Sequence, residues 1–409
     1  MSDTTHHPPS PPAGMTGQPA AQPQRHAQHA DAGAPDYDIA ICGAGPAGMA
    51  LAALLIRRGV PAARIALVDA RTLEQAGRDP RSLALSWGSR QILEEIGAWP
   101  IAATAIDEIH VSRRGQFGRS MITAAEQRVP ALGYVTRYGD LVTALGAVCA
   151  RAGVVALRPA RVAALDEMDD AVALTIDDGA PRVLRAAIVV QAEGGLFNEQ
   201  QTRSRHRDYQ QTAIIAQVRS TLPPPRRAYE RFTEQGPLAL LPQGEEYSMV
   251  WCVRPEQAAR LQALSDEDFL SALGQAFGER VGRFTHAAPR LAFPLGLNAD
   301  PRSSARTVAI GNAAQTLHPV AGQGLNLGLR DVAVLARLLA QGARPAMLAQ
   351  FTALRAQDRT TTVRLTDTMA RIFANDTPAQ GLLGLSLAAI DLFRPARSLL
   401  AELMMYGRR

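Results

Sequence analysis

The sequence contains no lysine, and all 43 of its Lys+Arg positions are arginine. These arginines outnumber 38 acidic residues, which gives a formal net charge of +5 at pH 7. No basic run with interleaved aromatic side chains is present, so the sequence gives no support for nucleic-acid binding. The charge predicts only a weak attraction to anionic phosphate groups and membrane surfaces.

Cysteine is scarce as well, and long apolar runs are missing. Cys42, Cys149 and Cys252 lie far apart, without the spacing of a disulfide framework or a metal site. This usage is typical of a reducing cytoplasm. No stretch approaches the roughly 18 apolar residues of a membrane span, and the N-terminal segment lacks the apolar core of a signal peptide. We therefore expect a cytoplasmic protein.

Residues 1–35 have almost no large apolar side chains and are rich in Pro, Ala, Gln and His. Such a segment cannot bury enough apolar surface to offset its ordering entropy, so we predict a disordered tail. The tail holds four of the eight histidines, for which metal binding is the alternative to a solvated role. The whole chain is 47% hydrophobic and 20% charged, which is typical of a soluble globular protein.

A glycine-rich turn follows the first apolar strand, at residues 37–42, and precedes a helical pattern over 49–58. Its G-x-G-x-x-G sequence is Gly43, Ala44, Gly45, Pro46, Ala47 and Gly48. In such a βαβ unit the glycines give a tight turn, a close approach to a pyrophosphate, and close packing of helix on strand. The N–H groups at the start of the helix then face the phosphates.

A second strand, at residues 64–68, ends at Asp69, which lies 21 residues after Gly48. A carboxylate there can accept hydrogen bonds from an adenosine ribose. The unit therefore predicts dinucleotide binding, with a structural turn and a solvated Asp69 as the alternative. It does not distinguish FAD from NAD.

A second turn of this kind occurs far along the chain. A buried strand at 306–310 runs into Gly311 and Asn312, then a loop rich in Pro and Gly, then a helix from about 325 to 339. Its physics suits a second anionic or polarised group; a plain loop between core elements is the alternative. Two nucleotide-type turns at opposite ends of one chain favour a long cofactor.

Residues 311–328 resemble the second flavin-contacting motif of the FAD-dependent aromatic hydroxylases, the p-hydroxybenzoate hydroxylase-like superfamily. Within it they are most similar to the ubiquinone-biosynthesis hydroxylases. The resemblance covers residues 36–409, and two segments are closest to the 2-polyprenyl-6-methoxyphenol hydroxylases. Those segments are 109–118 and 392–397, and the other matching segments are 81–85, 192–194, 230–242 and 248–251.

The resemblance implies two sets of cofactor-binding residues. The ADP half is expected on the glycine turn, residues 43–48, and on Asp69, with Arg81 near the pyrophosphate and Arg137 at a further contact. The flavin side is expected on Gly311, Asn312, Gly322, Gly324, Leu325 and Asn326, of which the last four contribute backbone. Two positions depart from the family: Asn312 and Glu193 each replace an aspartate, so Asn312 loses a charge but keeps its hydrogen-bonding capacity.

The resemblance also implies the chemistry: bound FAD, O2 as co-substrate, and NAD(P)H or another electron donor. Reduced flavin forms a C4a-hydroperoxide, and the phenol ring attacks its distal oxygen. Because the cofactor carries the hard chemistry, the lack of an evident triad, carboxylate pair or metal cluster is expected. His318, before Pro319, is the single catalytic candidate, since it can tune protonation beside the flavin; a structural loop histidine is the alternative.

The fold implied is α/β: a Rossmann-type FAD-binding domain, a second β-sheet substrate domain and a helical C-terminus. The FAD domain is expected at 36–106, 131–205 and 296–360, the substrate domain at 107–130 and 206–295, and the C-terminal helices at 361–409.

The expected substrate is a prenylated phenol, 2-polyprenyl-6-methoxyphenol. Other ubiquinone-biosynthesis proteins and the inner-membrane surface are further candidate partners. A hydroxylase for another ring position, a different aromatic hydroxylase and a non-enzymatic dinucleotide-binding module remain alternatives. The halogenases of this fold carry a Trp-x-Trp-x-Ile-Pro motif, which Trp87, Trp99 and Trp251 cannot form.

Overall fold

The computed structural model describes residues 34–114, 119–193, 207–297, 303–315, 322–374 and 394–407. From Pro35 onward the chain forms one compact unit. The predicted tail lies almost wholly outside the described residues, so its disorder stays a prediction. Among the described residues, no helix is long and apolar enough to cross a bilayer.

The first sheet is centred on β1 (Tyr37–Cys42) and has the order β8-β2-β1-β11-β10-β9, with β18 beside β11. β1 pairs in parallel with β2 and β11, as expected for a Rossmann-type core. The run from Ile39 to Cys42 is buried on both faces, which explains its continuous apolar sequence. The other strands are β2 (Ile65–Val68), β8 (Val155–Leu157), β9 (Arg161–Glu167), β10 (Val172–Asp177), β11 (Pro181–Gln191) and β18 (Thr307–Ala309).

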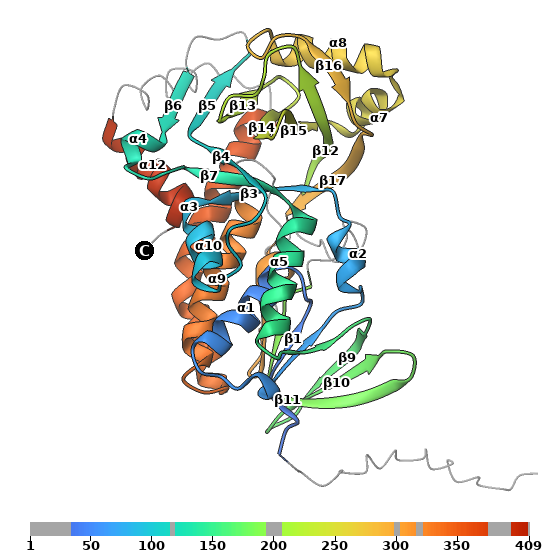
Figure 1. Cartoon of the computed structure of the whole chain (residues 1–409), viewed down its shortest axis with the longest axis vertical. Coiled ribbons are helices and arrows are strands. Elements are labelled where there is room, and N and C mark those ends of the chain that lie inside the picture. The colour runs from blue at the N-terminus through green and yellow to red at the C-terminus, as the bar shows by residue number, and fades with distance from the viewer. Residues whose placement is uncertain are drawn as a thin grey trace, which may run out of the picture. The chain divides into compact units, whose positions relative to one another are not determined.

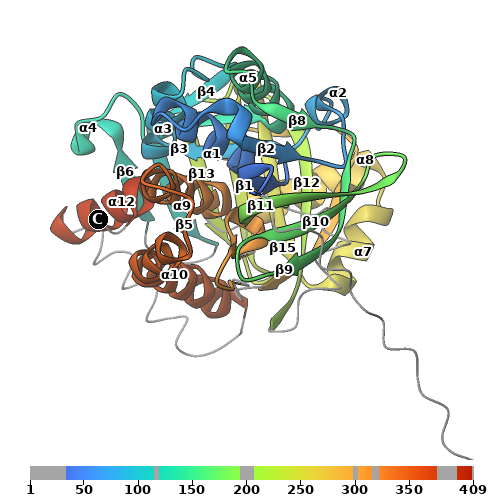
Figure 2. The ribbon, with the colours of Figure 1, turned by 90° about the horizontal axis from the view of Figure 1, so that it is seen from below.

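Helices cover one face of this sheet, as Figure 1 shows for its lower half and Figure 2 from below. The apolar side chains of α1, α5 and α9 form one buried cluster with Ile39 and Ile41 of β1. The opposite face, with Ala40 and Cys42, packs on apolar residues of β10 and β11. These helices are α1 (Pro46–Arg57), α5 (Tyr138–Arg151) and α9 (Gln323–Leu339).

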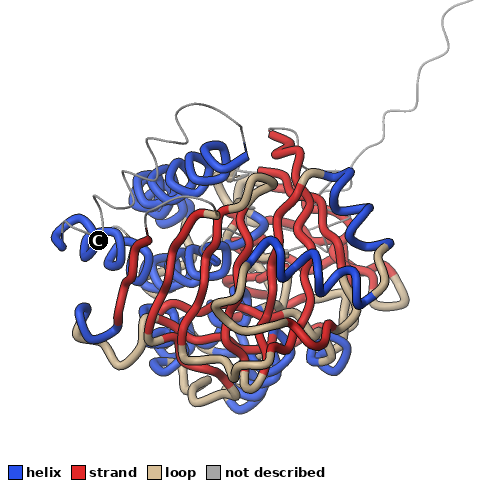
Figure 3. Tube along the Cα trace, turned by 90° about the horizontal axis from the view of Figure 1, so that it is seen from above, coloured by secondary structure: helices blue, strands red, loops and turns tan. Residues whose placement is uncertain are grey.

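The second sheet has the order β16-β12-β15-β14-β13-β5-β6, with β17 also paired to β12. Two helices lie over its outer face (Figure 3), where Tyr247, Phe269 and Phe277 are fully buried. Its strands are β5 (Glu108–Arg113), β6 (Arg119–Thr123), β12 (Arg207–Ser220), β13 (Arg227–Phe232), β14 (Pro237–Gln243), β15 (Glu246–Val253), β16 (Phe284–Ala287) and β17 (Leu291–Leu297), and the two helices are α7 (Pro255–Ala263) and α8 (Asp266–Phe277).

A small third sheet, β3-β7-β4, lies against the inner face of the second sheet. Ile106 and Val135 pack on Ala228 of β13, and the Ser82 hydroxyl donates a hydrogen bond to Gln243 Oε1 over 2.7 Å. The strands are β3 (Ser82–Ser86), β4 (Ala103–Ile106) and β7 (Gly133–Arg137). The remaining elements are η1 (Ala62–Arg64), α2 (Leu73–Gly77), α3 (Trp87–Glu95), α4 (Ala124–Gln127), η2 (Gly311–Ala313), α10 (Pro345–Ala374) and α12 (Arg394–Tyr406).

The predicted fold class is confirmed by this arrangement of parallel core, second sheet and helices. The second sheet draws its strands from residues 108–123 and 207–297, while the exact domain boundaries stay predictions. Helix α10 runs through residue 360, where we expected the FAD domain to end, because no proline or glycine interrupts its sequence after Pro345.

Candidate cofactor and substrate site

The glycine turn after β1 has almost no room for side chains. Gly43 has a φ of +106°, and a Cβ added there would lie 2.6 Å from backbone atoms of Ala192 and Glu193. A Cβ added at Gly48 would lie 1.9 Å from the carbonyl oxygen of Gly43. These two glycines therefore serve the fold, because the turn, the strand end and helix α1 touch through their backbones.

The first turn of α1 presents uncapped N–H groups. Gly45 is the N-cap residue, Pro46 occupies the first helical position, and no side chain caps this end. No acidic residue lies in the first turn to compete for these donors. Gly45 has an ordinary φ of −81°, and the nearest atom to an added Cβ is the Tyr138 hydroxyl, at 3.2 Å. Such a helix start suits a pyrophosphate, which is what the sequence predicts.

Asp69 is bound to the glycine turn itself. Its Oδ2 accepts a hydrogen bond from the Ala44 N–H over 2.7 Å, and its Oδ1 accepts one from the Arg71 N–H over 2.8 Å. Arg158 lies 3.8 Å from Oδ1 and donates to the Arg71 carbonyl over 2.9 Å. A carboxylate offers about four acceptor positions, so Asp69 can hold the turn and still bind a ribose. Our sequence prediction missed Arg158.

Replacing Asp69 with alanine should weaken FAD binding by roughly 1–3 kcal/mol, the usual value of charge-assisted hydrogen bonds. Binding is weakened for two reasons: the hydrogen bond to the ribose is lost, and the glycine turn is held less firmly. Titrating deflavinated protein with FAD, followed by flavin fluorescence, gives the dissociation constant. Asp69→Asn is the matched control, because it keeps one acceptor oxygen and should lose less. Identical constants for wild type and Asp69→Ala would place the ribose partner elsewhere.

Arg81 lies in a cluster next to Gly45. Its guanidinium pairs with Asp79 over 2.6 Å and lies 5.0 Å from the ring centroid of Tyr138. The Tyr138 hydroxyl, which faces Gly45, accepts a hydrogen bond from Arg71 over 3.3 Å. Two guanidinium groups thus lie around the residue nearest the uncapped helix start. Tyr138 and Arg71 were not predicted.

Arg137 is exposed at the end of β7, directly paired with Ser82 of β3. Its predicted contact with the cofactor stays a prediction. His318, the catalytic candidate, lies outside the described residues, as does the rest of 316–321.

The second motif meets the first one. Gly311 has a φ of +58°, and a Cβ added there would lie 3.4 Å from the Cβ of Ala47 in α1. A Cβ added at Gly328 of α9 would lie 3.1 Å from the Cα of Gly311. The turn at η2 is therefore held between the starts of two helices, and the two glycine motifs share one region as a long cofactor requires.

Helix α9 begins with a second uncapped N-terminus. Its N-cap residue, Gly322, has a φ of +59° and no side-chain cap, and the first turn has no acidic residue. A Cβ added at Gly324 would lie 3.7 Å from Asn312 Oδ1, so these residues lie together as predicted, and Leu325 beside them is partly buried. The helix start suits an electron-rich group, and both helix ends together fit the two halves of FAD.

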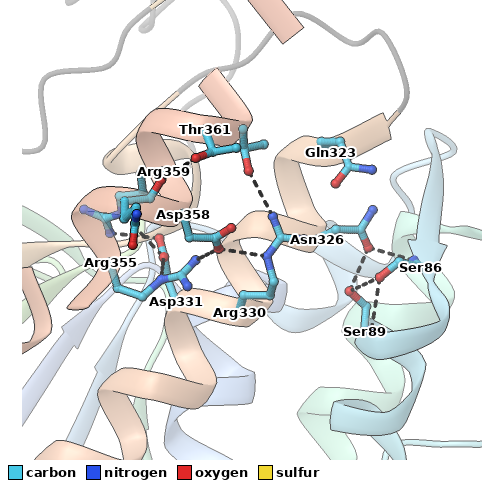
Figure 4. Close-up of polar contacts among 12 residues, drawn as sticks. Ser86, Ser89, Gln323, Asn326, Arg330, Asp331, Arg355, Asp358, Arg359 and Thr361 are labelled. Atoms are coloured by element: carbon cyan, nitrogen blue, oxygen red, sulfur yellow. Dashed lines mark hydrogen bonds and ion pairs between the residues drawn. The ribbon is translucent and has the colours of Figure 1, made fainter. Parts of the chain in front are cut away.

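Asn326 has a side chain that is fully committed to the fold (Figure 4). Its Oδ1 accepts hydrogen bonds from the Ser86 N–H and the Ser89 hydroxyl, over 2.8 and 2.7 Å. Its Nδ2 donates to the carbonyl oxygens of Ala84 and Gly322, over 3.0 and 2.8 Å. Only the backbone of Asn326 is therefore available to a flavin, and its side chain fixes the start of α9 against β3.

A buried ion network holds α9 to α10 (Figure 4). Asp331 is fully buried and pairs with Arg355 and Arg359 over 2.7 and 2.8 Å. Arg359 also donates to the Ala309 carbonyl over 3.3 Å, at the end of β18 and just before the second motif. We did not predict this network, because a lone aspartate in an apolar helix gives no sequence signal for its distant partners.

The inner face of the second sheet carries the carboxyl group of Glu230 and, at the start of β15, that of Glu246, which is paired with Arg219. Tyr229 of β13 packs on Phe277 on the outer side, with ring centroids 5.6 Å apart, so the next residue, Glu230, points to the inner side. Direct pairing places Val111, Glu230, Ala239, Val250 and Ile215 in one row across five strands. All five are only partly buried, whereas their outer-face neighbours, Arg231 excepted, are buried. The inner face is thus apolar around Glu230, and its side chains in this row are less completely buried than most of those on the outer face.

Glu230 has no partner for one of its oxygens. Oε1 is shielded from solvent and accepts no hydrogen bond within the described residues. Burial raises the pKa of the Glu230 carboxyl to about 8. One sequence signal could have identified it, namely an acidic residue at a strand position that alternation assigns to the interior.

This pKa predicts how stability depends on pH. The folded carboxyl keeps its proton up to about pH 8, whereas the unfolded chain releases it near about 4.3. Between these values the folded state binds more protons, so the free energy of unfolding falls as pH rises. Glu230→Gln removes this dependence, and its stability advantage over wild type should grow between pH 5 and 8, by an amount on the order of a few kcal/mol. Urea unfolding at both pH values measures the difference, and a constant difference would contradict the assignment.

Comparison with known proteins supports these features. Residues 36–366 match the family model described as an FAD binding domain. The chain is 34% identical over 382 residues to the ubiquinone hydroxylase UbiL of Rhodospirillum rubrum, with 88% of each chain covered. It is 31% identical over 314 residues to the 3-demethoxyubiquinol 3-hydroxylase of Escherichia coli, covering 74% of this chain and 79% of that one.

Among solved structures, the p-nitrophenol 4-monooxygenase PnpA from Pseudomonas putida DLL-E4 shares the fold. The TM-score is 0.73 at 16% identity, over 91% of this chain and 99% of that one. The extent of the sequence matches, over the same residues that form the two glycine motifs, confirms the predicted family and an FAD-dependent aromatic hydroxylase activity. This chain belongs to the FAD-dependent ubiquinone-biosynthesis hydroxylases of the p-hydroxybenzoate hydroxylase-like superfamily.

Proposed function

We propose that this enzyme hydroxylates the aromatic ring of a prenylated phenol, 2-polyprenyl-6-methoxyphenol, in ubiquinone biosynthesis. The co-substrates would be O2 and NAD(P)H or another electron donor. The observation that carries the proposal is the apolar row on the inner face of the second sheet, in which Glu230 has the one carboxyl group. The names of the relatives and the resemblance at residues 109–118 and 392–397 support the same substrate class.

Several groups of this chain would position the reactants. The uncapped starts of α1 and α9 would hold the pyrophosphate and border the flavin ring, and Asp69 would hold the ribose. When bound, FAD supplies the redox chemistry that activates O2. Because Asn326 fixes α9 to β3, and Ser82 of β3 bonds to Gln243 of the second sheet, the flavin side and the inner face share one strand.

The apolar row on the inner face suits a prenyl tail. It continues through Ile215 to its partner Leu291 on β17, which is 44% exposed. Apolar side chains that reach the surface allow a long tail to leave the site toward a membrane or a lipid carrier. We infer a cytoplasmic enzyme that meets its substrate at the inner-membrane surface, where its net positive charge favours anionic headgroups.

A second candidate is hydroxylation of the same kind of ring at another carbon. The similarity to the Escherichia coli 3-demethoxyubiquinol 3-hydroxylase favours it. The two candidates share cofactor, fold and substrate class, and they differ in the intermediate that accumulates when the enzyme is missing.

Quinone-intermediate analysis in a strain without this protein tests the proposal. We expect the prenylated methoxyphenol to accumulate and the benzoquinol that ring hydroxylation yields to be absent. Wild-type protein should restore ubiquinone, and Gly45→Val protein should not. Accumulation of an unmethoxylated phenol would favour the second candidate. A normal ubiquinone pool in aerated cells without a backup enzyme would contradict both.

A further inference from the structure

We propose that Glu230 binds the hydroxyl group of the phenol substrate and takes its proton during ring hydroxylation. The inference rests on the proposed function, since it requires a phenol on the inner face of the second sheet. Glu230 would then be a catalytic residue, and the cofactor would not carry out the chemistry alone.

The position of Glu230 is the first argument. Its neighbours in the row across the sheet are Val111, Ala239, Val250 and Ile215, none of which can donate or accept a hydrogen bond through its side chain. An apolar surface with one carboxyl group matches a prenylated phenol, which has an apolar ring and tail. The ring hydroxyl would meet the carboxyl, and the ring would lie against the small side chains of Ala239 and Val250.

The unsatisfied oxygen is the second argument. A buried polar atom without a hydrogen bond costs free energy, so proteins rarely keep one without a role. Glu230 Oε1 is shielded from solvent and has no partner among the described residues. A phenol hydroxyl would supply the missing donor. Forming this hydrogen bond would remove the unfavourable free energy of the unpaired oxygen and so strengthen substrate binding.

The surroundings are the third argument. Strand pairing places on the inner face the titratable groups Cys252 of β15 and Arg113 of β5, and, toward the start of β15, Glu246 with its partner Arg219 and His286 of β16. Arg137 of the packed strand β7 lies beside Ser82. Burial alone raises the pKa of Glu230, to about 8, while burial, and then the nearby charge of Glu230, raise the pKa of Cys252. A carboxylate whose pKa lies close to that of a phenol, about 10, is matched for exchanging a proton with it.

Glu230 acts as the base in the hydroxylation step. The carboxylate form of Glu230 takes the proton as the phenol O–H bond breaks, and the electron pair stays on the phenol oxygen. This raises the nucleophilicity of the ring carbons ortho and para to it, one of which forms a C–O bond to an oxygen atom from O2. The second oxygen atom leaves as water, with two electrons from NAD(P)H or another donor and with the protons from solvent that water and the new hydroxyl group require. Glu230 then returns its proton to the phenol oxygen. The ring C–H proton goes to solvent when aromaticity is restored.

The test uses FAD-loaded full-length protein and a short-chain prenylated methoxyphenol. Wild type, Glu230→Gln and Glu230→Leu are compared by turnover from pH 6 to 10 and by equilibrium binding of the phenol, read from the flavin absorbance. Glu246→Gln is the matched control, because Glu246 lies at the first position of β15 on the same face and its carboxyl group is paired with Arg219. Flavin content and thermal unfolding establish that each variant is folded and loaded.

We expect wild-type turnover to rise with pH through about 8. Glu230→Gln should lose roughly a hundredfold or more in kcat near pH 8, and its turnover should rise only toward the pKa of the phenol itself. Its amide can still hydrogen-bond, so its dissociation constant should change little, whereas Glu230→Leu should lose binding as well. Both variants should unfold at higher temperature than wild type, since an unpaired carboxyl is removed.

Unchanged turnover and an unchanged pH profile in Glu230→Gln, with active wild type, would overturn the inference and leave the proposed function standing. A folded, loaded Glu230→Leu that binds the phenol as wild type does would overturn it equally. Loaded wild type that hydroxylates no prenylated phenol would overturn the proposed function, and the inference with it.

Discussion

Purified Gly45→Val protein should be folded and contain no flavin. Gly45 has an ordinary φ, and the nearest atom to an added side chain is the hydroxyl of Tyr138 at 3.2 Å, the far end of a side chain that can shift. The valine side chain would instead occupy the space next to the N-terminus of α1, where we expect the pyrophosphate. Losing two charge-assisted hydrogen bonds to a phosphate costs about 3 kcal/mol or more, which weakens FAD binding more than about a hundredfold.

Gly48→Ala should behave differently, although it lies in the same motif. Its methyl group would meet the Gly43 carbonyl oxygen at 1.9 Å, which is backbone and cannot move aside. We expect a loss of about 3 kcal/mol or more in the free energy of unfolding, with flavin loss following from the damaged fold. Gly274→Ala is the control, because an added Cβ there meets nothing within 4 Å.

Full flavin content in folded Gly45→Val protein would contradict the cofactor site.

The second large effect is expected at Asp331. Asp331→Ala should lower the free energy of unfolding by about 3–5 kcal/mol, the usual cost of removing one partner from a buried ion pair. Arg359 would keep its hydrogen bond to the Ala309 carbonyl and its contact with the Phe351 ring, and Arg355 would keep its ion pair with Asp358. Because Ala309 lies two residues before Gly311 of the second glycine motif, FAD binding should weaken as well. Urea unfolding and flavin titration measure the two effects.

An exposed ion pair gives the matched control for Asp331. Asp178 pairs with Arg182 over 2.9 Å, and both side chains are well exposed to solvent. Asp178→Ala should change the free energy of unfolding by less than about 1 kcal/mol. Equal effects of the two substitutions would show that the buried network does not stabilise the packing of α9 on α10.

The sequence predicted those parts of the site that short-range constraints determine. The glycine spacing placed the turn after β1, and the structure begins α1 at Pro46, three residues before the expected start, because proline is well accommodated in the first turn. Helix α9 likewise begins at Gln323 and not near 325, since Gly322 adopts the left-handed conformation of its N-cap. The resemblance supplied the flavin-side residues that spacing alone did not identify.

Features that depend on long-range packing could not be predicted. Three of the four hydrogen bonds of the Asn326 side chain reach two other segments, with Ser86 and Ala84 on β3 and Ser89 on α3. The ion network depends on where α10 packs, and the isolation of Glu230 depends on neighbours from four other strands. In each case the residue type alone carries no signal in the sequence. The role of the residue depends on which side chains the fold places next to it.

The most direct test of the account is the origin of the oxygen atom in the product. Loaded protein is reduced without oxygen, mixed with the prenylated methoxyphenol and then exposed to gas enriched in oxygen-18, and the product is analysed by mass spectrometry. The account predicts one labelled oxygen atom in the new ring hydroxyl group and none when the label is in water. A hydroxyl group that carries oxygen from water, or reoxidation that yields only hydrogen peroxide with the phenol bound, would contradict it.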